Sequence, residues 1–121
     1  MRAVTLARVP GSPEVTEVAV PRPEAGEVLV KVAASSVNGF DLGTVAGYPQ
    51  DMMEHRFPLI PGKDFAGTVE AVGEGAEGFA VGDAVFGVDA KAHLGAGSMA
   101  QYVAVPAAVG IAHRPDQGFR A

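Results

Sequence analysis

Three side chains in the stretch VNGFDLGTVAGYP could do chemistry together: Asn38, Asp41 and Tyr48. The asparagine amide and the tyrosine hydroxyl both donate hydrogen bonds. Such donors stabilise the negative charge that develops on a substrate oxygen when no metal is present. Asp41 could orient one of these donors or pair with Lys63. This set of residues therefore suits a reaction that builds negative charge on a substrate oxygen.

Each candidate also has an ordinary structural interpretation, and both interpretations stay open on the sequence alone. Asn38 suits the N-cap of a short helical turn, and Tyr48 suits a packed loop aromatic. Phe40 could form a substrate wall or pack in the interior. His93 could approach the site from its loop or lie on the surface.

Two stretches match the spacing of a dinucleotide-binding fingerprint, GEGAEG at 73–78 and GAGSMA at 95–100. That fingerprint works only when a strand enters the glycine turn and a helix leaves it, because the helix N-terminus holds the pyrophosphate. The first stretch runs into FAVGDAV and the second into QYVAVP, and neither pattern is helical. Both stretches are therefore predicted to be turns that bind no nucleotide.

The pattern that must position these residues is one of short strands between Gly/Pro turns, since the chain holds 16 Gly and 9 Pro. Valines at 28, 30 and 32 alternate with Leu29 and Lys31, the period of a half-buried strand. Residues 39–47 are expected to form a bent connector rather than a helix, and 47–61 and 89–97 to form loops. The expected strands are 1–7 and 15–20, which form a hairpin, then 27–36, 65–72, 83–88, 98–105 and 109–112. This layout predicts a mainly β, partly open barrel with one or two short helical turns.

Composition excludes several classes of function. The 121 residues fit one domain, with 48% hydrophobic and 19% charged residues. There is no cysteine, so a disulfide framework and a thiolate metal site are excluded. A formal charge of -5 without a basic cluster argues against a nucleic-acid partner. No apolar run approaches the roughly 18 residues of a membrane span, so no membrane partner and a cytoplasmic location are expected.

The residues from Pro61 to Val85 follow the order PGxDxxGxVxxVGxGxxxFxxGDxV. This order resembles the GroES-like N-terminal domain of the medium-chain dehydrogenase/reductase superfamily, in particular its zinc-independent, quinone-oxidoreductase-like branch. The resemblance implies a GroES-like catalytic domain over residues 1–115, with 116–121 starting a linker to a nucleotide-binding domain of Rossmann type that this chain lacks. It also implies that the cofactor is NADPH, bound mainly by that other domain.

The same resemblance implies that zinc is not used. Zinc-dependent relatives carry a cysteine ligand at the position of Asn38 and a Gly-His-Glu triplet that aligns with Gly62, Lys63 and Asp64. Both ligands are missing here, and a protonated lysine repels a dication. The three histidines, His55, His93 and His113, are scattered without ligand spacing.

In the zinc-independent relatives the asparagine and aspartate lie beside the nicotinamide, and a tyrosine faces the substrate. The resemblance thus implies that Asn38 and Asp41 contact the cofactor and act with Tyr48 in catalysis. Phe40, Lys63 and His93 are further expected to contact the substrate. Many quinone reductases carry a tyrosine two residues after the aspartate, where this chain has Gly43. Quinones and α,β-unsaturated carbonyls, including enoyl thioesters, therefore both remain open as substrates.

Three functional hypotheses follow from the sequence. The first is the substrate domain of an NADPH-dependent oxidoreductase that has little or no turnover as this truncated chain. The second is a free-standing GroES-like module, or co-chaperonin relative, that binds small molecules or proteins without catalysis. The third is a reductase domain of a multidomain synthase. For the first, we expect self-association through the face that carries Asn38 and Tyr48, because a domain that packs on a partner exposes apolar surface.

Overall fold

The computed structural model describes residues 1–49 and 51–114. The expected linker at 116–121 lies outside the described residues. The elements, in chain order, are β1 (Arg2–Thr5), β2 (Glu14–Glu17), β3 (Glu27–Ser35), α1 (Gly39–Ala46), β4 (Glu54–Ile60), β5 (Asp64–Val72), β6 (Ala84–Val88), β7 (His93–Ala96), β8 (Tyr102–Pro106) and β9 (Ile111–His113).

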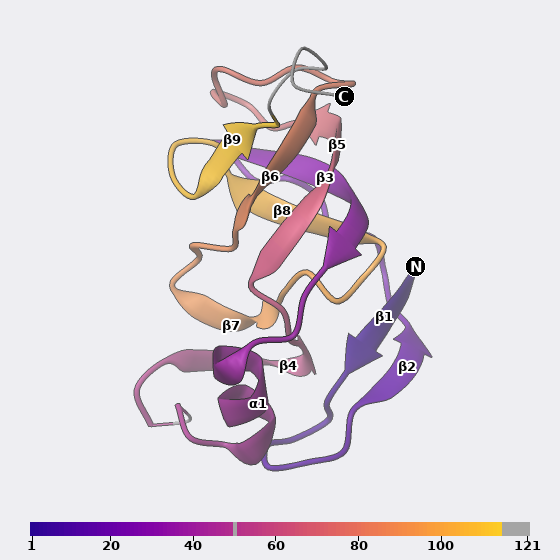
Figure 1. The fold of residues 1–121 in the computed structure, drawn as a ribbon, viewed down its shortest axis with the longest axis vertical. Helices are drawn as coiled ribbons and strands as arrows, with labels where there is room; N and C mark the ends of the chain where they lie inside the picture. Colours follow the sequence, from indigo (N-terminus) through magenta and orange to yellow (C-terminus); the bar gives the residue numbers. More distant parts are fainter. Residues whose placement is uncertain (50, 115–121) are drawn as a thin grey trace, which may run out of the picture.

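The main sheet has five strands in the order β8-β3-β5-β6-β9, and every pair in it is antiparallel. Its two edges, β8 and β9, are not paired with each other within the described residues, so the curved sheet does not close into a barrel (Figure 1). The expected hairpin of β1 and β2 forms a separate two-stranded sheet. The prediction of a mainly β, partly open architecture is confirmed.

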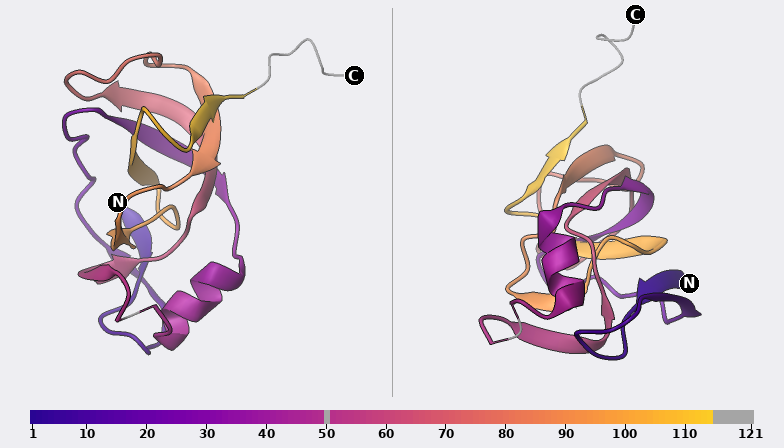
Figure 2. Two further views of the ribbon diagram at one scale, coloured as in Figure 1. Left: turned by 90° about the vertical axis from the view of Figure 1, so that its left-hand side faces the viewer. Right: turned by 60° about the horizontal axis from the view of Figure 1, so that its bottom comes forward.

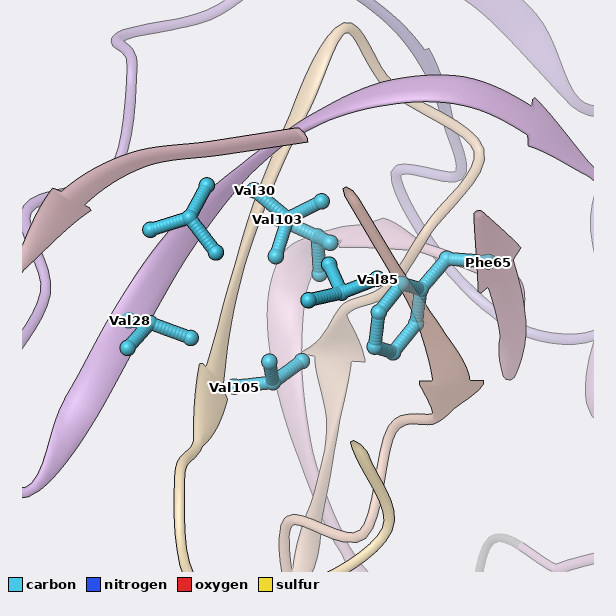
Figure 3. Close-up of a cluster of buried hydrophobic side chains, with 7 residues drawn as sticks. Val28, Val30, Phe65, Val85, Val103 and Val105 are labelled. Atoms are coloured by element: carbon cyan, nitrogen blue, oxygen red, sulfur yellow. The ribbon is translucent and has the colours of Figure 1, made fainter. Parts of the chain in front are cut away.

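The main core lies inside the curve of this sheet (Figure 3). Val28 and Val30 are fully buried, as the alternation in this strand predicts, but Leu29 on the opposite face is buried as well. Each fully buried valine stabilises the fold by about 1.5 kcal/mol or more. The buried members of this core are Val28, Val30, Phe65, Val69, Val85, Val103 and Val105.

A second, smaller core lies at the other end of the molecule, where α1 is found (Figure 2). It consists of Leu6, Val9, Leu59 and Leu94, and Val45 of α1 packs against it. The helix therefore packs on this smaller core, beside the segment after β1, rather than on the main core. No helix within the described residues has the length and apolar character needed to cross a membrane.

Two strands form where loops are expected, and they pair with each other. β4 lies inside the expected loop 47–61 and β7 inside the expected loop 89–97, and the two strands run parallel. Their register begins with Glu54 opposite His93. Gly95 makes this approach close, because a Cβ on it would collide with the backbone carbonyl of Arg56. Gly95 therefore serves a pairing between remote segments, and the prediction of loops over the residues of β4 and β7 is wrong.

Candidate functional site

Asn38 starts helix α1 as its N-cap. Its side-chain Oδ1 accepts a hydrogen bond of 3.0 Å from the backbone N–H of Phe40, and its own backbone N–H donates to Oδ2 of Asp41 at 3.0 Å. This reciprocal pair is a capping box, which satisfies backbone donors that a helix start leaves without partners. The capping box explains why residues 39–46 form a regular helix, where the sequence predicted only a bent connector.

Asp41 ties this helix to the segment before β5. It is only 2% exposed, and its Oδ1 accepts a hydrogen bond of 3.2 Å from the backbone N–H of Gly62. Gly62 has a positive φ of 109°, which glycine adopts without strain. Among the described residues Asp41 makes no ion pair with Lys63, and its two oxygens bond to the main-chain N–H groups of Asn38 and Gly62.

The side-chain amide of Asn38 is held from its other end by Asp64. Nδ2 donates to Oδ2 of Asp64 at 3.2 Å, and the hydroxyl of Ser36 donates to the same oxygen at 2.8 Å. Oδ1 accepts a hydrogen bond in the helix cap and one N–H donates to Asp64. These two hydrogen bonds together fix the orientation of the amide. Its second N–H has no partner in the part of the chain that the structure describes, and it is free to donate.

Lys63 and Phe40 form a second pair beside this amide. The Lys63 ammonium lies 5.3 Å from the centroid of the Phe40 ring, within the range of a cation–π contact. Phe40 is 41% exposed and Lys63 is half-buried. No carboxylate of the described residues lies within 4.0 Å of the ammonium.

A small cavity of about 10 Å³, room for one water molecule, lies between α1, the segment before β5 and β7. Phe40, Asp41, Lys63 and His93 all line it. Burial, and secondarily the charges of Arg56 and Lys91, hold the pKa of His93 below its ordinary value of 6.5, so its ring is neutral near pH 7. Four of the residues predicted from the sequence are thus brought together.

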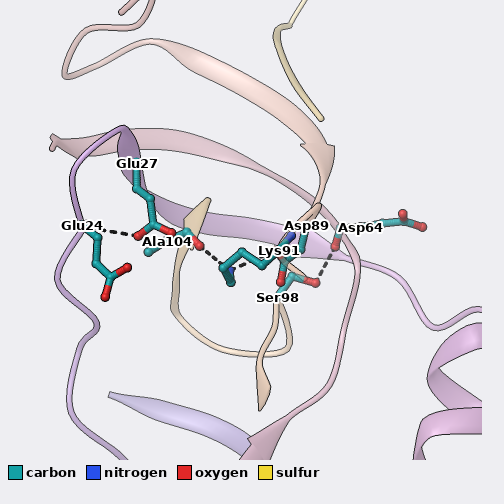
Figure 4. A network of polar contacts seen from close by, with 7 residues as sticks. All are labelled: Glu24, Glu27, Asp64, Asp89, Lys91, Ser98 and Ala104. Carbon is teal, nitrogen blue, oxygen red and sulfur yellow. Dashed lines mark hydrogen bonds and ion pairs between the residues drawn. The ribbon is translucent and has the colours of Figure 1, made fainter. Parts of the chain in front are cut away.

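The loop that leads into β7 and His93 is fixed by a buried ion pair that sequence reasoning missed. Lys91 lies 3.0 Å from Oδ1 of Asp89, with side chains only 8% and 4% exposed, and its ammonium also donates to the carbonyl of Ala104 (Figure 4). The backbone N–H of Asp89 donates to the carbonyl of Lys63 at 2.6 Å. The pair therefore anchors the loop to both β8 and the site.

Main-chain hydrogen bonds hold the segment 60–63, which carries the site, against residues 97–99. The carbonyls of Ile60, Pro61 and Gly62 accept from the backbone N–H groups of residues 97, 99 and 98 at 2.9, 3.0 and 3.1 Å. The hydroxyl of Ser98 donates to the backbone carbonyl of Asp64 at 2.7 Å (Figure 4). GAGSMA therefore contributes a main-chain clamp, and neither it nor GEGAEG leads into a helix, as predicted.

Two candidates do not line this cavity: Asn38, which adjoins it through its hydrogen bonds to Phe40 and Asp41, and Tyr48, which lies apart from it. Tyr48 follows the C-terminal end of α1 and is 81% exposed. A Cβ on Gly43 would lie 3.5 Å from its ring, so Tyr48 covers the side of the helix at Gly43. Its catalytic role stays a prediction.

Comparison with known proteins agrees with this geometry. An open, mainly antiparallel β domain with a single capped helix at a polar site is the architecture of GroES-like domains. The chain belongs to the alcohol dehydrogenase GroES-like domain family, whose model matches residues 24–116, and is an N-terminal domain of the medium-chain dehydrogenase/reductase superfamily.

Several relatives are oxidoreductases by name. A chloroplast envelope quinone oxidoreductase homolog of Arabidopsis thaliana is 38% identical over 74% of this chain and 26% of its own length. The quinone oxidoreductase of Lama guanicoe is 44% identical over 71% of this chain and 26% of its own. An alcohol dehydrogenase superfamily protein from Novosphingobium aromaticivorans superposes with a TM-score of 0.80 at 36% identity, over 95% of this chain and 34% of its own. The chain thus spans about a quarter of the length of the curated relatives named here.

Proposed function

We propose that this domain forms the substrate side of an NADPH-dependent, zinc-independent oxidoreductase that reduces quinones or α,β-unsaturated carbonyl compounds. The observation that carries the proposal is the amide of Asn38, which is fixed from both ends by Phe40 and Asp64 and keeps one N–H free. A donor that is already oriented costs no reorganisation when negative charge develops on a substrate oxygen.

The residues near Asn38 fit a nicotinamide. Ser36 and Val37, which precede Asn38, line an open groove of about 490 Å³ that also runs along residues 98–101. A carboxamide ring needs hydrogen-bond donors and acceptors at its edge. Ser36 supplies a hydroxyl oxygen there, which can accept a hydrogen bond while its O–H donates to Asp64. NADPH, when bound, supplies the hydride, and a nucleotide-binding domain elsewhere in a longer protein would hold the rest of it.

The residues of this chain then have separate roles in the proposal. The free N–H of Asn38 donates to the developing oxyanion, and Asp41 and Asp64 keep that donor in place. Phe40 offers its exposed face to a flat conjugated substrate. Tyr48 donates the proton that completes the reduction. Loss of one oxyanion donor of this kind lowers kcat by about 100-fold or more.

The donor set at this position does not fit zinc. Catalytic zinc takes three protein ligands from cysteine, histidine and carboxylate side chains. The lysine ammonium of Lys63 has no lone pair to offer, and Asn38 is committed to its helix cap. No step of the proposed reaction therefore runs through a metal.

A free-standing binding or scaffold module without catalysis is the second candidate. The observation that favours it is that Asn38, Asp41 and Asp64 bond to one another, as they would in a purely structural cap. The two candidates differ in whether the second N–H of Asn38 is used.

The test uses the protein encoded by the complete reading frame, assayed for NADPH oxidation with a quinone and with an enoyl thioester. Asn38→Ser keeps a hydroxyl for the helix cap but removes the amide donor, and should lower kcat about 100-fold with little change in unfolding free energy. Turnover that Asn38→Ser leaves unchanged would remove the amide from the mechanism. A wild-type protein that oxidises NADPH with neither substrate would favour the binding module.

A further inference from the structure

We propose that Lys63 makes this site selective for substrates that carry a permanent anionic group, a carboxylate or sulfonate attached to a planar conjugated ring. The inference rests on the proposed function and narrows its substrate class. It follows from a comparison of the charged groups around the small cavity. The lining of that cavity includes Phe40, Asp41, Lys63, Asp89 and His93.

The acidic groups near Lys63 already have partners. Both oxygens of Asp41 accept from backbone N–H groups, those of residues 38 and 62. Asp64 accepts from Ser36 and Asn38 through one oxygen. Asp89 pairs with the ammonium of Lys91 at 3.0 Å. None of these carboxylates lies within 4.0 Å of the Lys63 ammonium, so none forms an ion pair with it.

The other basic groups near the cavity are neutral or paired. His93 is neutral near pH 7 because burial lowers its pKa. Arg56, which neighbours His93 across the β4–β7 pairing, bonds to Glu54 at 2.6 Å. Lys91 forms its ion pair with Asp89. Within the described residues around this cavity, the cation without an acidic partner is Lys63.

Lys63 is also placed to recognise an anion together with a flat ring. Its ammonium already sits over one part of the Phe40 ring, at 5.3 Å from the centroid, and that ring remains 41% exposed. A conjugated substrate that packs on the exposed part of Phe40 can bring a carboxylate or sulfonate to the ammonium. Charge-assisted contacts of this kind are stronger than neutral ones.

The preference for an anionic substrate must come from a short-range contact with Lys63. The chain has a formal charge of -5, which repels anions from a distance. At physiological ionic strength charges separated by more than about 8 Å are largely screened, whereas a contact at a half-buried ammonium is screened much less. We therefore expect the selectivity to persist at that salt concentration.

The experiment compares a neutral naphthoquinone with its sulfonated analogue, using the complete reading frame's product with NADPH. Lys63→Met should lower the ratio of kcat/KM, sulfonated over neutral, at least tenfold. Lys63→Arg should restore the ratio to within about threefold of wild type. Lys31→Met, which removes an exposed lysine of β3, is the matched control and should leave the ratio unchanged. Lys63→Gln serves as a second neutral variant if Lys63→Met does not fold.

Binding of naphthalenesulfonate, measured by calorimetry against an uncharged naphthalene alcohol, separates this inference from the proposed function. Tighter binding of the sulfonate that is lost in Lys63→Met supports the inference even without turnover. Turnover with an unchanged substrate ratio in Lys63→Met overturns the inference while the oxidoreductase proposal stands. Failure of Lys63→Arg to restore the ratio also overturns it.

Discussion

The side-chain amide of Asn38 donates a hydrogen bond of 3.2 Å to the carboxylate of Asp64, which lies 26 residues further along the chain. The contact joins the N-cap of α1 to the first residue of β5. One oxygen of Asp64 serves both this amide and the Ser36 hydroxyl, so the acid orients the proposed donor without needing to touch a substrate. Asp64 is therefore a positioning residue.

Asp64→Ala should lower kcat about tenfold while KM changes little, because the amide loses its orientation but not its presence. We expect the loss of stability to stay near 1 kcal/mol, the usual net worth of a hydrogen bond. Steady-state kinetics and urea denaturation measure the two effects. Glu70→Ala, which removes an exposed acid from the same strand, is the control. A KM effect that dominates would instead place Asp64 in substrate binding.

Tyr48→Phe should lower kcat with an enoyl thioester about tenfold, because it removes a proton donor while keeping the ring beside Gly43. Stability should not change, since the side chain is largely exposed. The chain has one other tyrosine, Tyr102 on β8, and Tyr102→Phe is the matched control. Equal rates of wild type and Tyr48→Phe with both substrate classes would remove Tyr48 from the site.

Asp41→Ala should destabilise the fold by about 2–3 kcal/mol, because it breaks a capping box and leaves the N–H of Gly62 without its acceptor. Leu42→Ala, on the exposed side of the same helix, should cost far less. Chemical denaturation of both variants gives the comparison. Similar stability of the two variants would show that the cap contributes little.

Lys91→Met should destabilise the fold by about 3 kcal/mol, because it leaves the carboxylate of Asp89 buried without a counter-charge. The double variant Asp89→Leu/Lys91→Met should be more stable than Lys91→Met alone. Urea denaturation of the single and double variants forms the test. Additive losses would mean that the two side chains do not interact strongly.

His93 should make stability depend on pH below 6.5. Burial lowers its pKa in the folded protein, so between that lowered value and 6.5 the unfolded chain binds more protons. The contribution of His93 to the unfolding free energy is therefore fully present above pH 6.5 and decreases as the pH falls through this window. His93→Gln should flatten that part of a plot of unfolding free energy against pH. A slope that persists in His93→Gln would have to come from other groups.

Most of the main sheet could be predicted from the sequence because its strands are short apolar runs between turns rich in glycine and proline. Val28 and Val30 mark β3 by their spacing alone, and their neighbours pair in antiparallel order. β4 and β7 could not be predicted, since each is stabilised by the other across 39 residues, from Glu54 to His93. Helix α1 was underestimated because two glycines lower its propensity, whereas the capping box raises it.

The candidate site also contains some residues that could be predicted from the sequence and others that could not. The types and spacing of Asn38 and Asp41 point to a cap or to a donor, and the structure shows that the cap leaves a donor free. Asp64 and the Asp89–Lys91 pair were missed as supporting residues, because their partners lie on other segments. The sequence around a charged residue in a strand or loop does not indicate which partner that residue contacts in the folded protein.

The main-chain clamp between residues 60–63 and 97–99 bears on how this family can change its chemistry. The backbone that carries Lys63 is positioned by carbonyl and N–H groups, which every residue except proline supplies alike. The side chain at position 63 can therefore be exchanged without moving the position itself. A single substitution at position 63 can thus change the charge that a ligand meets while the architecture of the domain stays the same.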